Sequence, residues 1–517
     1  MLLSDVEKVA NKQVIVRLAP TAEKVMLQTY NWVKDIATST NKPVYGVNTG
    51  FGSLARVSIP PNQSSQLSKN LIRSHAAGVG PLADERTTRV MMLLRANALA
   101  KGVSGCRPVL VHTILDMLNC NCLPVIPMQG SCGSSGDLAP LAHLGLVLIG
   151  DPLGMAMYEG EQLPADKALQ KANILPITLE AKDGLAITNG AQLSAAIAAL
   201  NVIDAHDLIK VAEVAAAMSI EALLGISRAF HPAVHKLRPY LGARQTAANL
   251  LTLLQGSEFI DSVPEKLQDA YSIRCTPQVL GAVRDTLRFV ESQVAIELNS
   301  ATDNPLILLD VEDNSQGDAS NKAFSAGMFH GEPIGVAMDS LKIAISELAN
   351  LSERRLYRLT TGNLSQLLPP GLVGKDRPMV GMIVPQTTAA ALVSENKALA
   401  WPSSVDSIPT CEDQEDHIAM STVAARRMRD VLQNSRRVIA IELLSASQAL
   451  EFRLDSHKNK KMSVASIQAI QNVKQSMAHI QYPTIGEQIE AIASAIENKS
   501  ILHQLPNLLG IGDSCDH

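Results

Sequence analysis

The segment from Ala191 to Leu224 constrains the fold more than any other part of the chain. It is largely apolar and rich in alanine, and its length suits a long helix whose small side chains let neighbouring helices approach closely. Aromatic residues make up only 3% of the 517-residue sequence, so the core must be built largely from Leu, Ile, Val, Met and Ala. These two features favour a bundle of long helices over a β-sandwich.

Two further stretches have the three-to-four-residue apolar spacing of helices that bury one face. The first stripe consists of Val283, Leu287, Val290, Val294 and Leu298. The second consists of Met420, Ala424, Met428, Val431, Val438 and Ile441. The charged run 453–461 predicts a connector, and Gly and Pro are concentrated before about residue 190. We therefore expect a mainly α protein, with an irregular N-terminal part over residues 1–190 and a long helical bundle with C-terminal helices over 191–517.

Charge and cysteine content exclude several classes of protein. Lys and Arg number 45 against 50 Asp and Glu, without a basic cluster, which argues against nucleic acid or an anionic membrane as the main partner. No apolar run approaches the roughly 18 residues of a membrane span, and charges near Met1 argue against a secretory signal. Seven scattered cysteines indicate a reducing, cytoplasmic location, and no cluster has convincing metal-ligand spacing.

Residues 130–143, GSCGSSGDLAPLAH, contain three residues that can build an electrophile from the chain itself. If the backbone nitrogen of Gly136 attacks the carbonyl carbon of Ser134 and two waters leave, the three residues close into a 4-methylidene-imidazol-5-one ring. Gly136 suits the attacking position because it has no Cβ and adopts unusual backbone angles freely. Ser135 supplies the hydroxyl whose loss leaves the exocyclic methylene. By itself, Ser-Ser-Gly more often marks a flexible turn before a helix.

The whole fourteen-residue string resembles the signature of the histidine and phenylalanine/tyrosine ammonia-lyase family, G-S-x-G-A-S-G-D-L-x-P-L-[AS]-H, with Ser134 in place of the usual Ala. The resemblance implies that Ser134, Ser135 and Gly136 form the ring autocatalytically, without an external cofactor. It also implies an elongated bundle of the fumarase/aspartase-like superfamily, an amino acid substrate, and a homotetramer whose active sites are shared between subunits. By motif, the resemblance extends from about Val44 to Ala449.

Two other motifs resemble strings of the same family. Residues 45–52, YGVNTGFG, correspond to its tyrosine loop, which implies that the Tyr45 hydroxyl lies over the ring and acts as a base if its neighbours stabilise the phenolate. Residues 268–278, QDAYSIRCTPQ, resemble a histidase string and imply that Arg274 grips the substrate carboxylate with two parallel hydrogen bonds. The same string implies that Gln268 and Tyr271 line the site, Tyr271 among the catalytic residues.

Two shorter matches add residues near the ring. Residues 184–190, GLAITNG, imply that Asn189 contacts the ring, and residues 327–333, GMFHGEP, imply that Phe329 packs against it. Met328 replaces the family's Asn in the second string, and Cys411–Asp413 depart from the usual T-S-A-[NG] lead-in. These departures bear on rate and fine specificity, and they leave the ring residues and Arg274 untouched.

Two positions indicate which amino acid enters the site. Relatives that act on phenylalanine or tyrosine carry Phe-Leu or His-Leu at a selectivity pair, where this chain has the histidase pair Ser74-His75. Neutral His75 offers one donor and one acceptor to an imidazole. Glu415 stands where aromatic lyases have a neutral amide, and its carboxylate can accept an imidazole N–H. A purely structural interpretation would place Glu415 among acidic residues at the N-terminus of the following helix.

The sequence therefore predicts elimination of ammonia from L-histidine to give trans-urocanate. Either Tyr45 or Glu415 could be the main base. A phenylalanine or tyrosine lyase, or an aminomutase, of the same family is the alternative, and a non-catalytic helical homologue is a remote one. A serine hydrolase is disfavoured because the chain shows neither a G-x-S-x-G elbow nor alternating strands.

Overall fold

The computed structural model describes residues 1–39, 43–50, 57, 59–311, 321–374, 381–511 and 513. Contacts between Cα atoms divide the chain into two compact units, each assembled from three separate segments. The first unit comprises Met1–Leu200, Ser292–Met338 and Pro402–Arg426, and the second comprises Asn201–Glu291, Asp339–Trp401 and Arg427–His517. The sequence suggested a division at residue 190, which differs from this division by contacts. It stays a prediction about where the catalytic motifs are concentrated.

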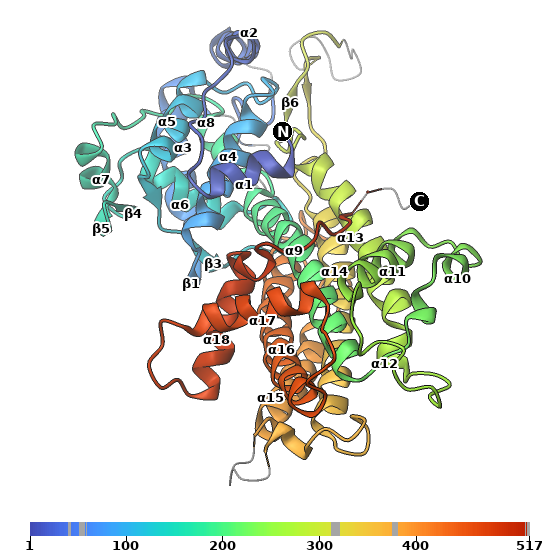
Figure 1. The fold of residues 1–517 in the computed structure, drawn as a ribbon. Helices are drawn as coiled ribbons and strands as arrows, with labels where there is room; N and C mark the ends of the chain where they lie inside the picture. The colour runs from blue at the N-terminus through green and yellow to red at the C-terminus, as the bar shows by residue number, and fades with distance from the viewer. Residues whose placement is uncertain are drawn as a thin grey trace. The chain divides into compact units, whose positions relative to one another are not determined.

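Long helices dominate the architecture, which confirms the mainly α fold (Figure 1). The longest contribute residues to both units; they are α9 (Gln192–Ala222), α13 (Thr276–Glu297), α14 (Glu332–Thr360) and α16 (Ser421–Ser456). Helix α9 begins and ends within two residues of the predicted Ala191–Leu224 segment. The two apolar stripes fall on α13 and α16 or directly beside them, and every residue of both stripes is buried. Within the described residues, no helix combines the length and apolar character needed to span a membrane.

The first unit contains most of the shorter N-terminal elements, coloured blue to green in Figure 1. Its remaining helices are α1 (Leu3–Ala10), α2 (Pro20–Ser39), α3 (Ser64–His75), α4 (Glu85–Leu99), α5 (Pro108–Asn119), α6 (Leu138–Leu148), α7 (Ala165–Lys171) and α8 (Asp183–Thr188). Its strands are β1 (Val79–Leu82), β2 (Leu123–Pro124), β3 (Pro127–Gln129), β4 (Met155–Tyr158), β5 (Glu161–Pro164), β6 (Leu306–Ile307) and β7 (Ala323–Phe324). They form small antiparallel sheets of order β1-β3, β2-β4-β5 and β6-β7.

Helices α3, α6 and α8 pack against one another and position the functional site described below. Two glycines allow this close packing. A Cβ on Gly145 of α6 would lie 3.0 Å from the Ile72 side chain, and one on Gly184 of α8 would lie 2.9 Å from the Cβ of Ser68. Both Ile72 and Ser68 belong to α3, so larger residues at these glycines would push α3 outward.

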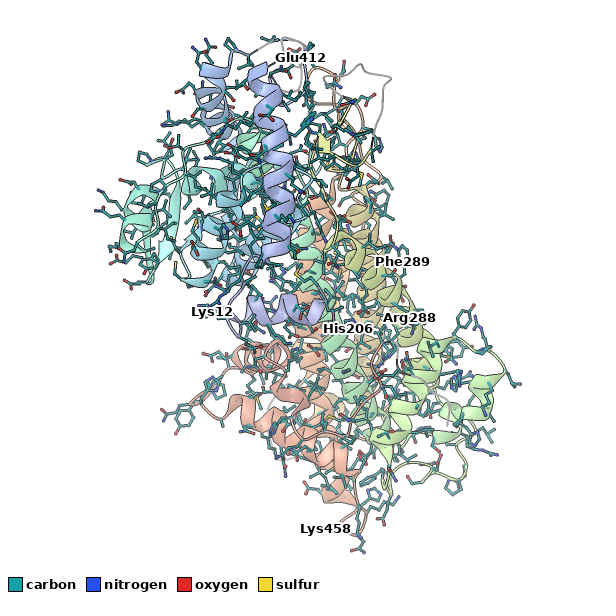
Figure 2. All side chains as sticks on the ribbon, turned by 90° about the horizontal axis from the view of Figure 1, so that it is seen from above. Lys12, His206, Arg288, Phe289, Glu412 and Lys458 are labelled. Carbon is teal, nitrogen blue, oxygen red and sulfur yellow. The ribbon has the colours of Figure 1, made fainter. Side chains whose placement is uncertain are left out.

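The second unit is held together by buried polar clusters as well as apolar packing. Its other helices are α10 (Pro232–Lys236), α11 (Leu241–Leu254), α12 (Tyr271–Arg274), α15 (Ile383–Leu399), α17 (Val464–Met477) and α18 (Ile485–Glu497). Glu213 of α9 accepts two hydrogen bonds from Arg284 of α13, at 2.9 and 2.8 Å. Two turns earlier along α9, α9 and α13 lie side by side where Figure 2 labels His206 and Arg288, and His206 Nε2 lies 3.2 Å from the Glu291 carboxylate.

The charged connector predicted over residues 453–461 is wrong at its start. Helix α16 continues to Ser456, and Arg453 is buried. Its guanidinium donates hydrogen bonds to the carbonyl oxygens of Ala222, Ser365 and Gln366. It thereby provides donors for backbone acceptors at the end of α9 and in a nearby loop. The charge that suggested solvent exposure is instead used inside the unit.

Candidate active site

A cavity of about 410 Å³ lies within the first unit, a volume typical of small-molecule sites. It brings together five residues predicted from the sequence, namely Tyr45, His75, Ser135, Asn189 and Glu415. The remaining lining consists of Gly50, Val57, Ile59, Leu67, Asn70, Leu71, Ser74, Leu138, Leu185, Thr188 and Cys411. The cavity wall is thus largely apolar, with a few polar groups directed to one space.

The Ser134-Ser135-Gly136 segment is pressed against the backbone that follows α8. Gly136 has a φ of +76°, and a Cβ at this position would overlap the backbone of Gly190. Gly136 and Gly190 form a parallel bridge, and the backbone N–H of Asp137 donates to the Gly190 carbonyl oxygen at 2.8 Å. Asn189 Nδ2 donates to the carbonyl oxygen of Ser135 at 3.1 Å. Only glycine fits at position 136, as attack by its backbone nitrogen also requires.

Asp137 anchors this segment, a role that the sequence did not reveal. The side chain is fully buried and does not cap α6, although it directly precedes that helix. Its carboxylate accepts hydrogen bonds from Ser131 Oγ (2.6 Å), the Ser194 backbone N–H (2.7 Å) and Thr422 Oγ1 (2.6 Å). The loop is thereby tied to the first turns of α9 and α16.

Arg95 holds the other side of the same contact. Its side chain is fully buried, and Nη1 donates to the Asn189 carbonyl oxygen at 2.6 Å and to Gln192 Oε1 at 2.7 Å. Burial lowers the pKa of Arg95, while Asp303 acts in the opposite direction. Asn189 Oδ1 is buried and has no hydrogen-bond partner among the described residues. Asn189 is therefore fixed through its backbone and keeps an acceptor at the site.

Glu415 faces the ring-forming segment directly. Its Oε1 accepts a hydrogen bond from Ser135 Oγ. Its Oε2 accepts from Ser134 Oγ at 3.2 Å and from Thr410 Oγ1 at 2.6 Å. Backbone hydrogen bonds between Thr410 and Glu415 close a turn of four intervening residues, and the first three, 411–413, have φ of +53°, +54° and +62°. Glu415 thus lies in this turn, ahead of the start of α16 at Ser421, and not in the helix's first turn.

His75 is the last residue of α3 and lines the same cavity. Its Nδ1 lies 2.8 Å from the Leu71 carbonyl oxygen, and because a carbonyl only accepts, Nδ1 carries the proton. In the neutral ring, Nε2 is then an acceptor. Burial lowers the pKa of His75, opposed by the Leu71 hydrogen bond and by the negative charge of Glu415. The lowered pKa favours the neutral form near pH 7.

The lining residues of α3 include several that sequence reasoning missed. All the lining residues of α3 follow a helical spacing of three and four, and they are Leu67, Asn70, Leu71, Ser74 and His75. The spacing itself was the available signal. Of these positions, only the pair Ser74-His75 was singled out from the sequence.

Tyr45 reaches the cavity from a tight turn. The Val44 backbone N–H donates to Asn48 Oδ1 at 2.7 Å, and the Gly46 N–H donates to Thr49 Oγ1 at 3.1 Å. Gly46 has a φ of +70°, and a Cβ there would collide with the Leu185 side chain. The turn is therefore shaped by Gly46 and presents the half-buried Tyr45 to the cavity. The neighbouring residues 51–56 lie outside the described part of the chain.

Besides Ser134 and Gly136, which flank the lining residue Ser135 in the chain, four predicted site residues are not among those lining the cavity. Phe329 is half-buried in the segment before α14, which is linked to the ring-forming loop by a hydrogen bond from Gly331 N–H to the Gly133 carbonyl oxygen (3.0 Å). Gln268, Tyr271 and Arg274 belong to the second unit. Tyr271 is 71% exposed, and the Arg274 guanidinium stacks over its ring at 4.7 Å while donating through Nε to the Asp269 carbonyl oxygen.

The sequence profile of aromatic amino acid lyases matches residues 1–475. The chain belongs to the aromatic amino acid lyase family. It is 48% identical over 461 residues to a histidine ammonia-lyase of Caldanaerobacter subterraneus, covering 89% of this chain and 88% of that protein.

Solved structures agree with this family assignment. The fold is similar to that of a histidine ammonia-lyase from Trypanosoma cruzi, with a TM-score of 0.86, 34% identity, and coverage of 98% of this chain and 94% of that one. It is also similar to a tyrosine aminomutase from Streptomyces globisporus, with a TM-score of 0.89, 32% identity and 98% coverage of both chains.

The aromatic amino acid lyase family comprises enzymes known for an internal catalytic group. The residues of this chain fit a ring built from Ser134, Ser135 and Gly136. Gly136 occupies a position where a Cβ would overlap Gly190, and Asn189 donates to the Ser135 carbonyl, the oxygen that a methylidene-imidazolone retains.

Proposed function

We propose that the protein eliminates ammonia from L-histidine to give trans-urocanate, and that 4-methylidene-imidazol-5-one forms from its own Ser134, Ser135 and Gly136. The observation that carries the proposal is the pairing of His75 and Glu415 in one cavity beside the ring-forming residues. The similarity to curated histidine ammonia-lyases over most of the chain supports it.

The polar end of the cavity suits an imidazole. His75 Nε2 and the Glu415 carboxylate are both acceptors, so together they complement the two N–H groups of an imidazolium side chain. A phenyl ring would leave both acceptors desolvated and unpaired, which a hydrogen-bonding site rejects strongly. The same argument disfavours tyrosine, whose hydroxyl can donate to one of the two acceptors.

The ring, once formed, supplies an electrophile that turns the amine into a workable leaving group. The residues of the chain do the rest. Asn189 holds the Ser135 carbonyl, and Tyr45 or Glu415 takes the proton from the substrate's β-carbon. Comparing Tyr45→Phe with Glu415→Gln separates these two candidates, because substituting the main base lowers kcat far more than substituting its neighbour.

We also propose a cytoplasmic homotetramer in which subunits share active sites. The exposed Tyr271 and the half-buried Arg274 that stacks on it support this arrangement, because a carboxylate-binding arginine held with its tyrosine at a surface is available to a second copy of the chain. Mixing Arg274→Ala with Tyr45→Phe protein under subunit exchange tests it. Recovery of activity above both parents supports sharing, and a purely monomeric mass by light scattering contradicts it.

The decisive experiment is ultraviolet absorbance during incubation with L-histidine, L-tyrosine and L-phenylalanine separately. Urocanate from L-histidine alone supports the proposal, and His75→Leu should raise KM for L-histidine at least tenfold because an acceptor is lost. A cinnamate or coumarate signal would overturn the substrate assignment. A β-amino acid product, detected by chromatography, would instead indicate an aminomutase, the activity named for the Streptomyces globisporus relative.

A further inference from the structure

The two places where the motifs depart most clearly from the family's strings meet at one carboxylate. Ser134 stands where the family has Ala, and residues 411–413 replace its usual lead-in. In the structure, Ser134 Oγ donates to Glu415 Oε2 at 3.2 Å, and residues 411–413 lie in the turn between Thr410 and Glu415, whose backbones form an antiparallel bridge. Thr410 Oγ1 donates to the same oxygen at 2.6 Å.

The turn that presents Glu415 needs such support. Its three consecutive left-handed residues, Cys411, Glu412 and Asp413, each have a Cβ, and this conformation costs roughly 1 kcal/mol or more per residue without glycine. All three are exposed, so few contacts offset the cost. Hydroxyls that grip Glu415 from the ring-forming segment and from Thr410 fix the carboxylate at the end of this strained turn.

Ring closure changes the partners of Glu415 unequally. A bond forms between Gly136 N and the carbonyl carbon of Ser134. The Ser134 carbonyl oxygen leaves as water with the amide protons of Ser135 and Gly136, and Ser135 Oγ leaves as a second water with its own proton and the Ser135 Cα proton. Ser134 Oγ belongs to neither water. The donor to Oε1 is therefore consumed, while both donors to Oε2 remain.

We propose that Ser134 is a positioning residue that holds Glu415 by Oε2, and that ring closure frees Oε1 to accept the substrate's imidazole N–H. Before closure, Ser135 occupies the oxygen that recognises the substrate. After closure, the same carboxylate is anchored on one side and open on the other. The inference deepens the proposed function and rests on it, since it takes histidine as the partner of Glu415.

Steady-state kinetics of the full-length protein test the role of Ser134. Intact mass first establishes that Ser134→Ala and Ser134→Thr each lack two waters, as the ring requires. Ser134→Ala should raise KM for L-histidine about tenfold with a smaller change in kcat, because a hydrogen bond to a charged group is lost. Ser134→Thr retains the hydroxyl and should restore the KM. Ser104→Ala, which removes a buried hydroxyl that does not line the cavity, is the matched control.

Binding without turnover tests the exchange at Oε1. Ser135→Val and Ser135→Thr have the same shape and differ in a hydroxyl, and calorimetry with L-histidine is performed on protein that intact mass shows to be linear. Ser135→Val should bind about tenfold more tightly, because its Oε1 is open. Adding Ser134→Ala to Ser135→Val should weaken binding again.

The outcomes separate this inference from the proposed function. Equal affinities of the two Ser135 variants would overturn the exchange at Oε1. An unchanged KM in Ser134→Ala, or Ser134→Thr behaving like Ser134→Ala, would overturn the positioning role. When the unaltered protein makes urocanate, either result counts against the inference alone. Failure of the unaltered protein to make urocanate counts against the proposed function.

Discussion

Among single residues, Glu297 at the end of α13 has an ionisation that bears on stability. Burial raises the pKa of Glu297 from 4.5 to about 7, and the nearby negative charge of Asp137 adds to the effect. The folded protein therefore keeps a proton on this carboxyl between about pH 4.5 and 7, where the unfolded chain has lost it. Stability from this group is fully present below pH 4.5 and declines as pH rises to about 7, above which the cost stays constant.

Glu297→Gln should remove this cost. The difference between 4.5 and about 7 corresponds to about 3 kcal/mol, so the variant should gain up to about 3 kcal/mol in free energy of unfolding at pH 8. At pH 4 both proteins carry a neutral side chain, and we expect equal stability. Urea unfolding at the two pH values measures the difference. The exposed Glu161, substituted in the same way, should show no comparable gain, and an equal change at both pH values would contradict the assignment.

Gly136 gives a second prediction at this scale. Gly136→Ala should abolish the loss of two waters and all lyase activity, because the methyl group would displace the Gly190 backbone. Gly160 provides the control, since it has a similar φ of +81° but open space around its Cα. Gly160→Ala should cost only about 1–2 kcal/mol for the left-handed backbone, and Gly136→Ala clearly more. Intact mass and thermal unfolding provide the measurements.

At the scale of elements, the way a segment packs determined whether its structure could be predicted from the sequence. Helices α13 and α16 were predictable because each carries a repeating apolar pattern that buries one face, and α9 because of its long apolar, alanine-rich run. On the cavity face of α3, Asn70 was not predictable, because a polar residue that lines a cavity has the same pattern as one on a solvent-exposed face. Ser74 and His75 on the same face were found only through the resemblance to the family. The role of Asp137 was equally hidden, since two of its partners lie 57 and 285 residues away in the sequence.

The turn between Thr410 and Glu415 supplies a prediction for an element. Glu412, labelled in Figure 2, is exposed and has a φ of +54°. Glu412→Gly should raise the free energy of unfolding by about 0.5–1 kcal/mol, because relief of the left-handed backbone exceeds the entropy cost of glycine. Gln414→Gly, at a neighbouring position without positive φ, should lower it. The opposite order in chemical denaturation would show that the turn is not strained.

At the scale of the whole molecule, buried ion pairs and hydrogen bonds connect the helices of the second unit. Glu442 of α16 accepts hydrogen bonds from Arg355, at 2.5 and 2.8 Å, and from Ser219 and Ser352. Both members of the pair are fully buried, so three long helices share one ionic cluster. Removing one partner leaves the other charge without compensation inside the unit.

Arg355→Met should therefore lower the free energy of unfolding by about 3–5 kcal/mol. The double variant Arg355→Met/Glu442→Leu should recover much of this loss, because it replaces the pair with apolar volume. Chemical denaturation followed by circular dichroism measures both. A double variant as unstable as the single one would show that the cluster contributes more than the compensation of two charges.

Helix α9 differs from a surface helix in having almost no face toward water. Its half-exposed positions are confined to one short stretch, Asp204 to Lys210, and nearly every other residue is buried on whichever side it lies. In a saturation mutagenesis library across α9, the positions that tolerate substitution should therefore not recur with the helical period along the whole helix. Variants would survive within the two turns from Asp204 to Lys210, and elsewhere even Ala→Val would be rejected. We therefore expect most of α9 to tolerate almost no substitution.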